Sequence, residues 1–350
     1  MAEAVTISAE KLAAFTEAIF AAAGMSQAHA ATIAEVLLWA DLRGSPSHGV
    51  QRIPRYLEII DAGEMNVRPE MTIAKELPGA VLIEADRAPG QVAMSFAVTE
   101  AARKAKQAGI GLALVRRTTH TAALGFYTRA AALKGFAALA GSASWPNMIY
   151  HGAREVGVAT NPLSLAVPRG SDEPIVFDMA TGVVALGKIV HAARMGESIP
   201  EGWALDADGN PTTDPNKAVL PLPLGGPKGS GLALMIECIA SLITANPLVA
   251  ETLEGTAEGK KHRQNAFLIA IDIAAFGALD LFAQNLARTE TALKKLPRQS
   301  ESDEILMPGE RGTRELASRW RSGVTIPAPT WAAIAKIAAR FSIAMPDASA

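Results

Sequence analysis

The sequence is poor in cysteine and in aromatic residues, with one cysteine in 350 residues and 5% Phe, Trp and Tyr. A single cysteine excludes a disulfide within the chain, which is typical of proteins from a reducing compartment. Cys238 stands inside the apolar run LALMIECIASLITA, where we expect a buried core thiol. No group of Cys and His residues has the spacing of a structural zinc site, so we expect no metal.

The chain also lacks an excess of charge and a long apolar run. Its 33 Lys and Arg against 35 Asp and Glu give a net charge of -2, so nucleic acid is not an expected partner. The best candidate for a membrane span, residues 232–245, is shorter than the ~18 residues required and contains Glu237. The N-terminal MAEAVTISAEKLAAF lacks the basic start and apolar core of a signal peptide. We therefore expect a cytoplasmic protein.

Hydrophobic residues, by contrast, make up 49% of the chain, enough for a large core, and the length favours about two or three domains. The first 65 or so residues read as helices capped by Ser8 and Ser26, with a third after Ser47. In the third, either the helix begins near Pro54 or residues 48–53 form a distinct first turn. From about residue 70, short β-rich runs alternate with Ala-rich helical runs, which indicates an α/β domain. The tail returns to a helix that Thr330 is expected to cap.

The usual glycine signature of a nicotinamide site is absent. Gly109 and Gly111 come closest to G-x-G-x-x-G, but they precede a strand, and Leu114 holds the third glycine position. We interpret Gly109 as a helix stop. A second cluster, GGPKGSG at residues 225–231, runs into an apolar helix and includes Lys228. Backbone N–H groups at a helix start, together with a lysine, predict phosphate or carboxylate binding, although a plain turn would have the same composition.

Three further positions have side chains suited to chemistry. Asp178 ends the strand PIVFDMA, where it could bind a ligand or simply cap the next helix. His48 and Arg52, four residues apart on a helical turn, would share a face. An arginine can grip a carboxylate while an imidazole exchanges a proton with a C2 oxygen, as a 2-oxo acid requires. A solvated surface pair has the same spacing. His120 follows the strand GLALVRR and could line a cleft or be an ordinary loop histidine.

Six segments, in order, resemble the malate/L-lactate dehydrogenase family that lacks a Rossmann fold. They are DLRGSPSHGVQRIPRYLE, GVATNPLSLAVP, PIVFDMATGVVALGKI, IPEGWALDADGNPTTDP, PLGGPKGSGLALMIE and MPGERGTRE. This family also includes ureidoglycolate dehydrogenase, L-sulfolactate dehydrogenase, 2,3-diketogulonate reductase and the reductase of piperideine-2-carboxylate. The resemblance implies an NAD(P)-dependent enzyme, a homodimer, that transfers a hydride to or from C2 of a small 2-oxo or 2-hydroxy acid.

The resemblance also implies a fold and a set of site residues. The fold is the L-sulfolactate dehydrogenase-like one: a mixed sheet flanked by helices, with a helical substrate-side domain from residues 1–70 and 311–350. Residues 71–310 form the NAD(P)-binding region, with room for two subdomains. His48 matches the family's proton donor, His120 a second acid/base histidine, and Ser47 and Arg52 substrate contacts. The cofactor-contacting positions match Ser144, Asp178, Met179, Ala180, Lys228, Gly229, Pro308, Gly309 and Glu310.

The match departs from the family's pattern around the second histidine. The usual Asn-Ser-x-His-Phe-Gly reads Arg117-Thr118-Thr119-His120-Thr121-Ala122. Early segments look nearest to ureidoglycolate dehydrogenase and MPGER nearer to the imine reductase, so an NADPH-dependent reductase of cyclic imino acids stays an alternative. Two rivals from other classes are a metal-dependent hydrolase with His48, His120 and Asp178 as ligands, and a non-catalytic dinucleotide-binding protein. No H-x-x-x-H or H-E-x-x-H pattern supports the first.

Overall fold

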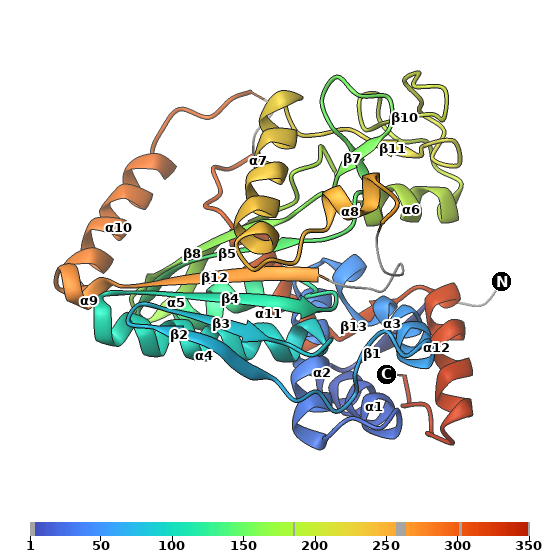
Figure 1. Ribbon diagram of the computed structural model, residues 1–350, viewed down its shortest axis with the longest axis horizontal. Helices are drawn as coiled ribbons and strands as arrows, with labels where there is room; N and C mark the ends of the chain where they lie inside the picture. Colours follow the sequence, from blue (N-terminus) through green and yellow to red (C-terminus); the bar gives the residue numbers. More distant parts are fainter. Residues whose placement is uncertain (1–3, 185, 257–263, 301–302, 349–350) are drawn as a thin grey trace.

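A mixed β-sheet forms the centre of the computed structural model, which describes residues 4–184, 186–256, 264–300 and 303–348 (Figure 1). Its seven strands lie in the order β2-β3-β4-β12-β5-β8-β9. Only β3 and β4 pair in parallel, and the other neighbours are antiparallel, so the sheet is not a doubly wound one. The strands are β2 (Thr72–Leu77), β3 (Ala80–Glu84), β4 (Ile110–Thr118), β5 (Phe136–Ala143), β8 (Leu163–Arg169), β9 (Asp172–Met179) and β12 (Gln264–Asp272).

Helices cover both faces of this sheet, which confirms the predicted α/β arrangement. On one face, α4 (Gly90–Ala108) lies against β4 and β12, and α5 (Gly125–Ala132) against β5 and β8. On the other, α7 (Pro227–Glu237) and the π-helical turn η3 (Cys238–Leu242) pack through Ile236 and Ala240 on Leu114 and Phe267. Cys238 itself is only partly buried and is not among the residues of this apolar cluster, so the predicted core thiol was wrong.

The glycines at 109 and 111 serve packing rather than a ligand. Gly109 ends α4 in the left-handed conformation, at φ 79°, as a helix stop should. At Gly111 a Cβ would lie 2.0 Å from the carbonyl oxygen of Ala101. The absence of a side chain therefore lets α4 lie directly on β4.

The N-terminal helices begin where their caps predict. The Ser8 hydroxyl accepts from Lys11 N at 3.4 Å at the start of α1 (Ala9–Ala22), and Ser26 accepts from His29 N at 3.2 Å at the start of α2 (Gln27–Leu42). In the third segment both alternatives hold in part. Residues 46–48 and 50–52 form two 3₁₀ turns, and α3 (Ile53–Asp61) begins beside Pro54.

The two ends of the described chain lie side by side (Figure 1). Strand β1 (Val5–Ile7) pairs antiparallel with β13 (Val324–Ile326), and Arg340 of α12 (Ala328–Arg340) binds the Asp61 carboxylate of α3. Helix α11 (Glu310–Ser322) packs on α2. Thr330 does not cap α12, contrary to prediction: the helix starts at Ala328, because Pro329 is accommodated within the first turn.

Smaller elements complete the chain. Helix α6 begins at residue 186, later than the predicted start near Thr181. The remaining elements are α6 (Leu186–Met195), β6 (Met148–Ile149), β7 (Val156–Val158), β10 (Ala204–Leu205), β11 (Leu220–Pro221), α8 (Val249–Leu253), α9 (Ile273–Phe276) and α10 (Leu279–Lys294). Within the ranges described above, no helix combines the length and the apolar character that a membrane crossing requires.

Candidate active site

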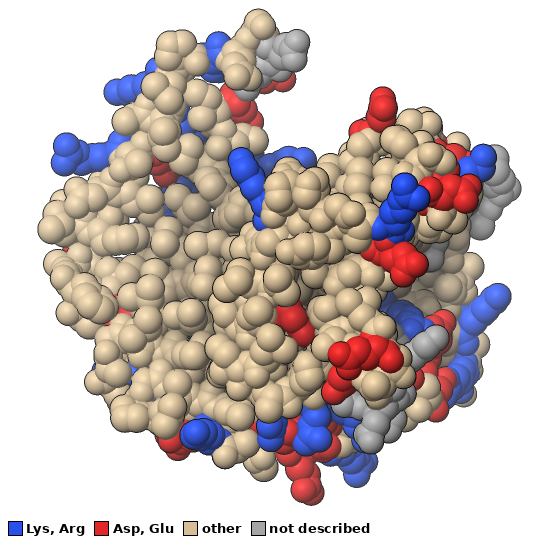
Figure 2. All heavy atoms as spheres, turned by 45° about the horizontal axis from the view of Figure 1, so that its top comes forward, with Lys and Arg blue, Asp and Glu red and all other residues tan. Residues whose placement is uncertain are grey.

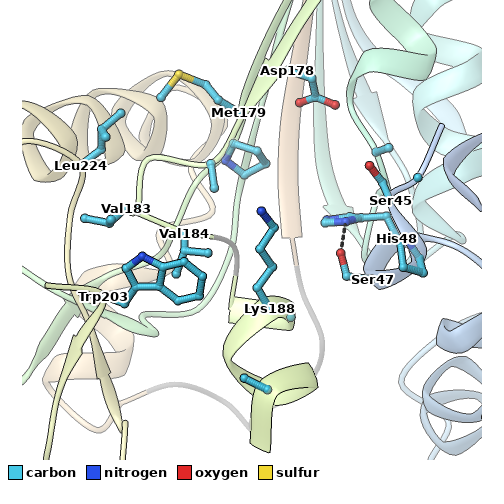
Figure 3. Close-up of a pocket in the computed structure, with 18 of the residues that line it drawn as sticks. Ser45, Ser47, His48, Asp178, Met179, Val183, Val184, Lys188, Trp203 and Leu224 are labelled. Carbon is cyan, nitrogen blue, oxygen red and sulfur yellow. Dashed lines mark hydrogen bonds between the residues drawn. The ribbon is translucent and has the colours of Figure 1, made fainter. Parts of the chain in front are cut away.

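A cleft of about 880 Å³ separates the turn after α2 from the segment that carries α6, β10 and β11 (Figure 3). Ser47 and His48 lie on one side, Trp203 and Leu224 on the other, and Asp178 at the inner end of β9 between them. The cleft therefore joins residues from the N-terminal helices, the sheet and the glycine-rich region, as a site for a large ligand requires.

The two histidines singled out in the sequence meet in this region. The rings of His48 and His120 stack with centroids 5.7 Å apart and an angle of 24° between the planes. His48 lines the cleft, and the loop after His120 contributes Ala122, Ala123 and Leu124 to its wall. Two histidines that are 72 positions apart in the sequence thus form one imidazole pair.

The turn that bears His48 differs from the predicted helical turn. Gly49 is extended and separates the two 3₁₀ turns. A Cβ at this position would lie 2.0 Å from the buried Asp41 carboxylate, so only glycine fits here. The same carboxylate accepts from Val50 N at 2.7 Å. Arg52 reaches back, and its Nε donates to the Ser47 carbonyl at 2.5 Å. The pair at positions 48 and 52 therefore does not share a helical face, and Arg52 instead holds the His48 turn.

Burial shifts the pKa values of His48 and Asp41 on this side of the cleft. Burial, with a smaller contribution from the Arg52 charge, lowers the pKa of His48 to about 4, so the imidazole is neutral at neutral pH. The Ser47 hydroxyl lies 3.0 Å from His48 Nδ1 and fixes the ring's orientation (Figure 3). Burial also raises the pKa of Asp41 to about 7. The neutral imidazole is the form of His48 that can accept a proton.

Asp178 ends β9 at the inner end of the cleft. One carboxylate oxygen accepts from Gly125 N at 2.7 Å, at the start of α5. The side chain is open to the cleft, yet the protein atoms packed around it raise its pKa to about 6. Helix α6 begins at residue 186, so Asp178 does not cap the helix that follows it, and its carboxylate instead binds the first N–H of α5. Asp178 faces the same space as His48 (Figure 3).

The glycine-lysine turn, residues 225–231, is built onto this strand end. Leu224 N donates to the Thr181 carbonyl at 2.9 Å, and Leu224 lines the cleft. At Gly229 a Cβ would lie 2.5 Å from both Leu224 N and Thr181 O. The turn can therefore close on the end of β9 only with glycine at this position. It starts helix α7, whose N-terminal end carries the partial positive charge of the helix dipole.

The other predicted cofactor positions are spread around the cleft. Met179 and Ala180 line it, whereas Lys228, Ser144 and Glu310 are not among its lining residues. Ser144 N donates to Asn161 Oδ1 at 3.1 Å. Glu310 is held by Lys294 at 2.8 Å and by Arg314 at 2.6 Å. Beside Pro308, Gly309 lines an adjoining pocket of about 260 Å³ together with Asp178.

Sequence reasoning missed several residues of this region. Lys188 of α6 projects into the cleft toward Asp178, and Trp203 forms its far wall (Figure 3). Tyr56 and Gln91 lie behind His120. Lys188 could have been found as the one cation in the run TGVVALGKI, but nothing local distinguishes the other three. In the part of the chain that is described, no three His, Cys, Asp or Glu side chains gather closely enough to hold a metal ion.

Comparisons with known proteins agree with this architecture. The family model "Malate/L-lactate dehydrogenase" matches residues 7–335. Ureidoglycolate dehydrogenase (NAD(+)) of Escherichia coli K12 is 35% identical over 307 residues, 87% of each chain. A Pseudomonas putida enzyme, Delta(1)-pyrroline-2-carboxylate/Delta(1)-piperideine-2-carboxylate reductase, is 33% identical over 320 residues, covering 90% of this chain and 92% of its own. The sulfolactate dehydrogenase structure from Methanocaldococcus jannaschii superposes with a TM-score of 0.86 at 30% identity, over 97% of this chain and 98% of that one.

Fold and cleft together define an oxidoreductase with a non-Rossmann α/β fold. The chain belongs to the malate/L-lactate dehydrogenase family.

The loop around His120 has left-handed backbone at two of the positions that depart from the family's pattern. Arg117 and Ala122 stand where the family's pattern usually has asparagine and glycine, and both adopt left-handed backbone, at φ 56° and 57°. Asparagine and glycine tolerate that conformation better than other residues, whereas arginine and alanine pay a steric cost. The loop that carries His120 is thus held in its shape by its surroundings.

Proposed function

We propose that the protein transfers a hydride between a nicotinamide dinucleotide and C2 of a small 2-oxo or 2-hydroxy acid of the malate, lactate or ureidoglycolate type. The single observation that carries this is the cleft itself. It brings a neutral His48 opposite the Asp178 end of β9, beside the glycine-lysine turn. A proton-exchanging imidazole and an anion-binding helix start are the two requirements of such a reaction.

The residues present fit a dinucleotide. The turn at residues 225–231 has a glycine that no larger residue can replace, exposed Lys228 and the start of α7. These are groups that bind a pyrophosphate. When bound, the nicotinamide ring supplies the hydride acceptor or donor. The residues proposed to hold the cofactor, NAD or NADP, are Ser144, Asp178, Met179, Ala180, Lys228, Gly229, Pro308, Gly309 and Glu310.

The substrate side is proposed to bind an anion and move one proton. Lys188 in the cleft and the Arg52 guanidinium behind His48 provide positive charge for a carboxylate. In the direction of oxidation, neutral His48 accepts the proton of the C2 hydroxyl as the hydride leaves C2. The Ser47 hydroxyl orients the His48 ring. His120 is the second member of the imidazole pair.

Reduction of cyclic imino acids is the alternative, because the P. putida relative reduces pyrroline-2-carboxylate and piperideine-2-carboxylate. In this alternative reaction the hydride would again be added to C2, next to the carboxylate, and the C2 atom would be double-bonded to nitrogen instead of oxygen. The experiment that tests both is a panel of 2-hydroxy acids, 2-oxo acids and cyclic imino acids, assayed with each nicotinamide cofactor by absorbance. Turnover of one class is expected. Cofactor binding without turnover of any compound would indicate a non-catalytic dinucleotide-binding protein instead.

The pH dependence of the reaction follows from the lowered pKa of His48. Oxidation needs the neutral imidazole, so kcat/KM for a hydroxy acid should rise through about pH 4 and be level above it. Reduction needs the protonated form, so its kcat/KM should fall about tenfold for each pH unit above that value. Initial rates at saturating cofactor measure both profiles. A hydroxy acid profile that keeps rising through neutral pH would contradict the assignment.

We also propose that the protein acts as a homodimer, and that residues 1–70 with 311–350 form the substrate-side unit next to an α/β unit of residues 71–310. The face over α7 and η3 is largely uncharged (Figure 2). On it Met235, Leu242 and Ile243 are 55%, 51% and 64% exposed. Large apolar side chains exposed on a face with few charges favour contact with a second chain.

A further inference from the structure

Two buried residues that the proposed function does not use bind one ring nitrogen of His120. Gln91, at the start of α4, and Tyr56, on α3, are 0% and 1% exposed. The Gln91 Nε2 donates to the Tyr56 hydroxyl oxygen at 2.9 Å. That hydroxyl lies 2.7 Å from His120 Nδ1. The three side chains form a hydrogen-bond chain that runs from inside the protein to the imidazole pair.

Two contacts at His120 Nδ1 give the direction of this chain. The N–H of Ala122 donates to the same His120 Nδ1, at 3.3 Å. A backbone N–H can only donate, so Nδ1 acts as an acceptor, but at 3.3 Å this contact is long and weak, and the 2.7 Å contact with the Tyr56 hydroxyl contributes most to keeping Nδ1 without a proton. Tyr56 then donates its hydroxyl proton to Nδ1, and its oxygen accepts from Gln91. A neutral imidazole has one N–H, which in His120 must therefore be on Nε2.

The surroundings keep both members of the chain in these states. Burial raises the pKa of Tyr56 to about 12, so the hydroxyl keeps its proton and stays a donor. Arg52 places a positive charge near Tyr56 and near His48, whose ring stacks on His120. A proton on Nδ1 would use the lone pair that the Tyr56 hydroxyl and the Ala122 N–H share, so both contacts would be lost. The left-handed backbone of Ala122 is what aims its N–H at the ring.

We propose that Gln91 and Tyr56 are positioning residues that hold His120 as a neutral imidazole protonated on Nε2, so that His120 donates a hydrogen bond to the C2 oxygen and His48 alone exchanges the proton. In oxidation the C2 hydrogen leaves as a hydride to the cofactor, the hydroxyl proton goes to His48, and the C–O bond becomes a carbonyl. The Nε2 proton of His120 stays in place. The role at the C2 oxygen rests on the proposed function, whereas the tautomer of His120 does not.

The tautomer can be measured directly in the full-length protein without substrate. Two-bond ¹H–¹⁵N correlation spectra of protein labelled with ¹⁵N-histidine distinguish Nε2–H from Nδ1–H rings, and the signals that disappear in His120→Asn identify His120. We expect Nε2–H in the wild-type protein. In Tyr56→Phe, which removes the hydroxyl donor, we expect a mixture of the two tautomers. An Nδ1–H ring in the wild-type protein would overturn the proposal.

Kinetics and a matched variant separate positioning from simple destabilisation. Tyr56→Phe should lower kcat by about tenfold or more with little change in KM. Tyr127→Phe is the control, because it removes an equally buried hydroxyl that donates to the Thr121 carbonyl of the same loop. It should leave the His120 tautomer unchanged. An unchanged tautomer and kcat in Tyr56→Phe would reject the positioning role.

Gln91→Leu provides a second variant. It removes the amide that fixes the Tyr56 oxygen as acceptor, and it should shift the tautomer ratio in the same direction as Tyr56→Phe. If Tyr56→Phe does not fold, the wild-type and Gln91→Leu spectra still decide the proposal. The expected tautomer without turnover of any panel substrate would support the positioning of His120 and reject the proposed reaction.

Discussion

Replacing His48 with alanine should lower kcat by ~10²–10⁴-fold, the usual range for losing a general acid or base. The reason is chemical, because the cleft then lacks the neutral imidazole that takes the proton from the C2 hydroxyl. Cofactor affinity should be nearly unchanged, since the glycine-lysine turn is built on β9 and α7 and not on the His48 turn. Stopped-flow hydride transfer and titration of cofactor fluorescence measure the two quantities separately.

His29→Ala is the control for this variant. His29 lies in α2, which also precedes the cleft, but it is not among the lining residues. It should keep kcat and KM close to the wild-type values. Added imidazole should restore part of the activity of His48→Ala by entering the vacated space. Near wild-type turnover in His48→Ala would remove His48 from the mechanism.

Replacing Gly229 with alanine should destabilise the protein and weaken cofactor binding together. Its Cβ would lie 2.5 Å from two backbone atoms, Leu224 N and Thr181 O, neither of which can rotate away. The end of β9 and the start of α7 would have to separate. Forcing an extra carbon into a packed site costs about 1–3 kcal/mol. Thermal unfolding with and without cofactor should show a lower midpoint and a smaller shift on adding cofactor.

Gly231→Ala is a matched control two residues further along the same turn. No atom lies within 4 Å of the position its Cβ would take. Because Gly231 is inside α7, alanine should stabilise the helix by up to about 1 kcal/mol. Equal effects of the two substitutions would show that the turn tolerates side chains, and would argue against its close contact with a cofactor.

The features of the fold that were predictable from the sequence are those with strong local signals. Ser8 and Ser26 mark helix starts through their own side chains, and Gly109 marks a helix end through its left-handed backbone. Strands β4 and β12, at the middle of the sheet, are apolar runs with largely buried side chains, whereas β2 is exposed along its whole length. Strands of two or three residues, such as β1 and β13, have too few side chains for a periodic pattern. They form because a distant partner supplies the hydrogen bonds.

The residues of the candidate site also divide into those that the sequence predicted and those that it could not. His48, Asp178 and the glycine-lysine turn stand in ordered motifs, and the structure brings them to one cleft. The helical face shared by His48 and Arg52 did not form, because Gly49 between them is extended and the Val50 N–H binds the Asp41 carboxylate of α2. Tyr56 and Gln91 could not be found from the sequence. Tyr56 is 64 residues from His120, and Gln91 is 35 residues from Tyr56, so only tertiary packing makes the three residues neighbours.

The pairing of β1 with β13 constrains how the protein can be made. The hydroxyls of Thr6 and Thr325 meet at 3.0 Å although 319 positions separate them along the chain. During synthesis, the first strand therefore emerges from the ribosome long before its partner exists. The apolar side of β1 and α1 must wait, partly uncovered, for the last segment to arrive. Closing so long a loop is slow, which makes docking of the tail the expected final step of folding.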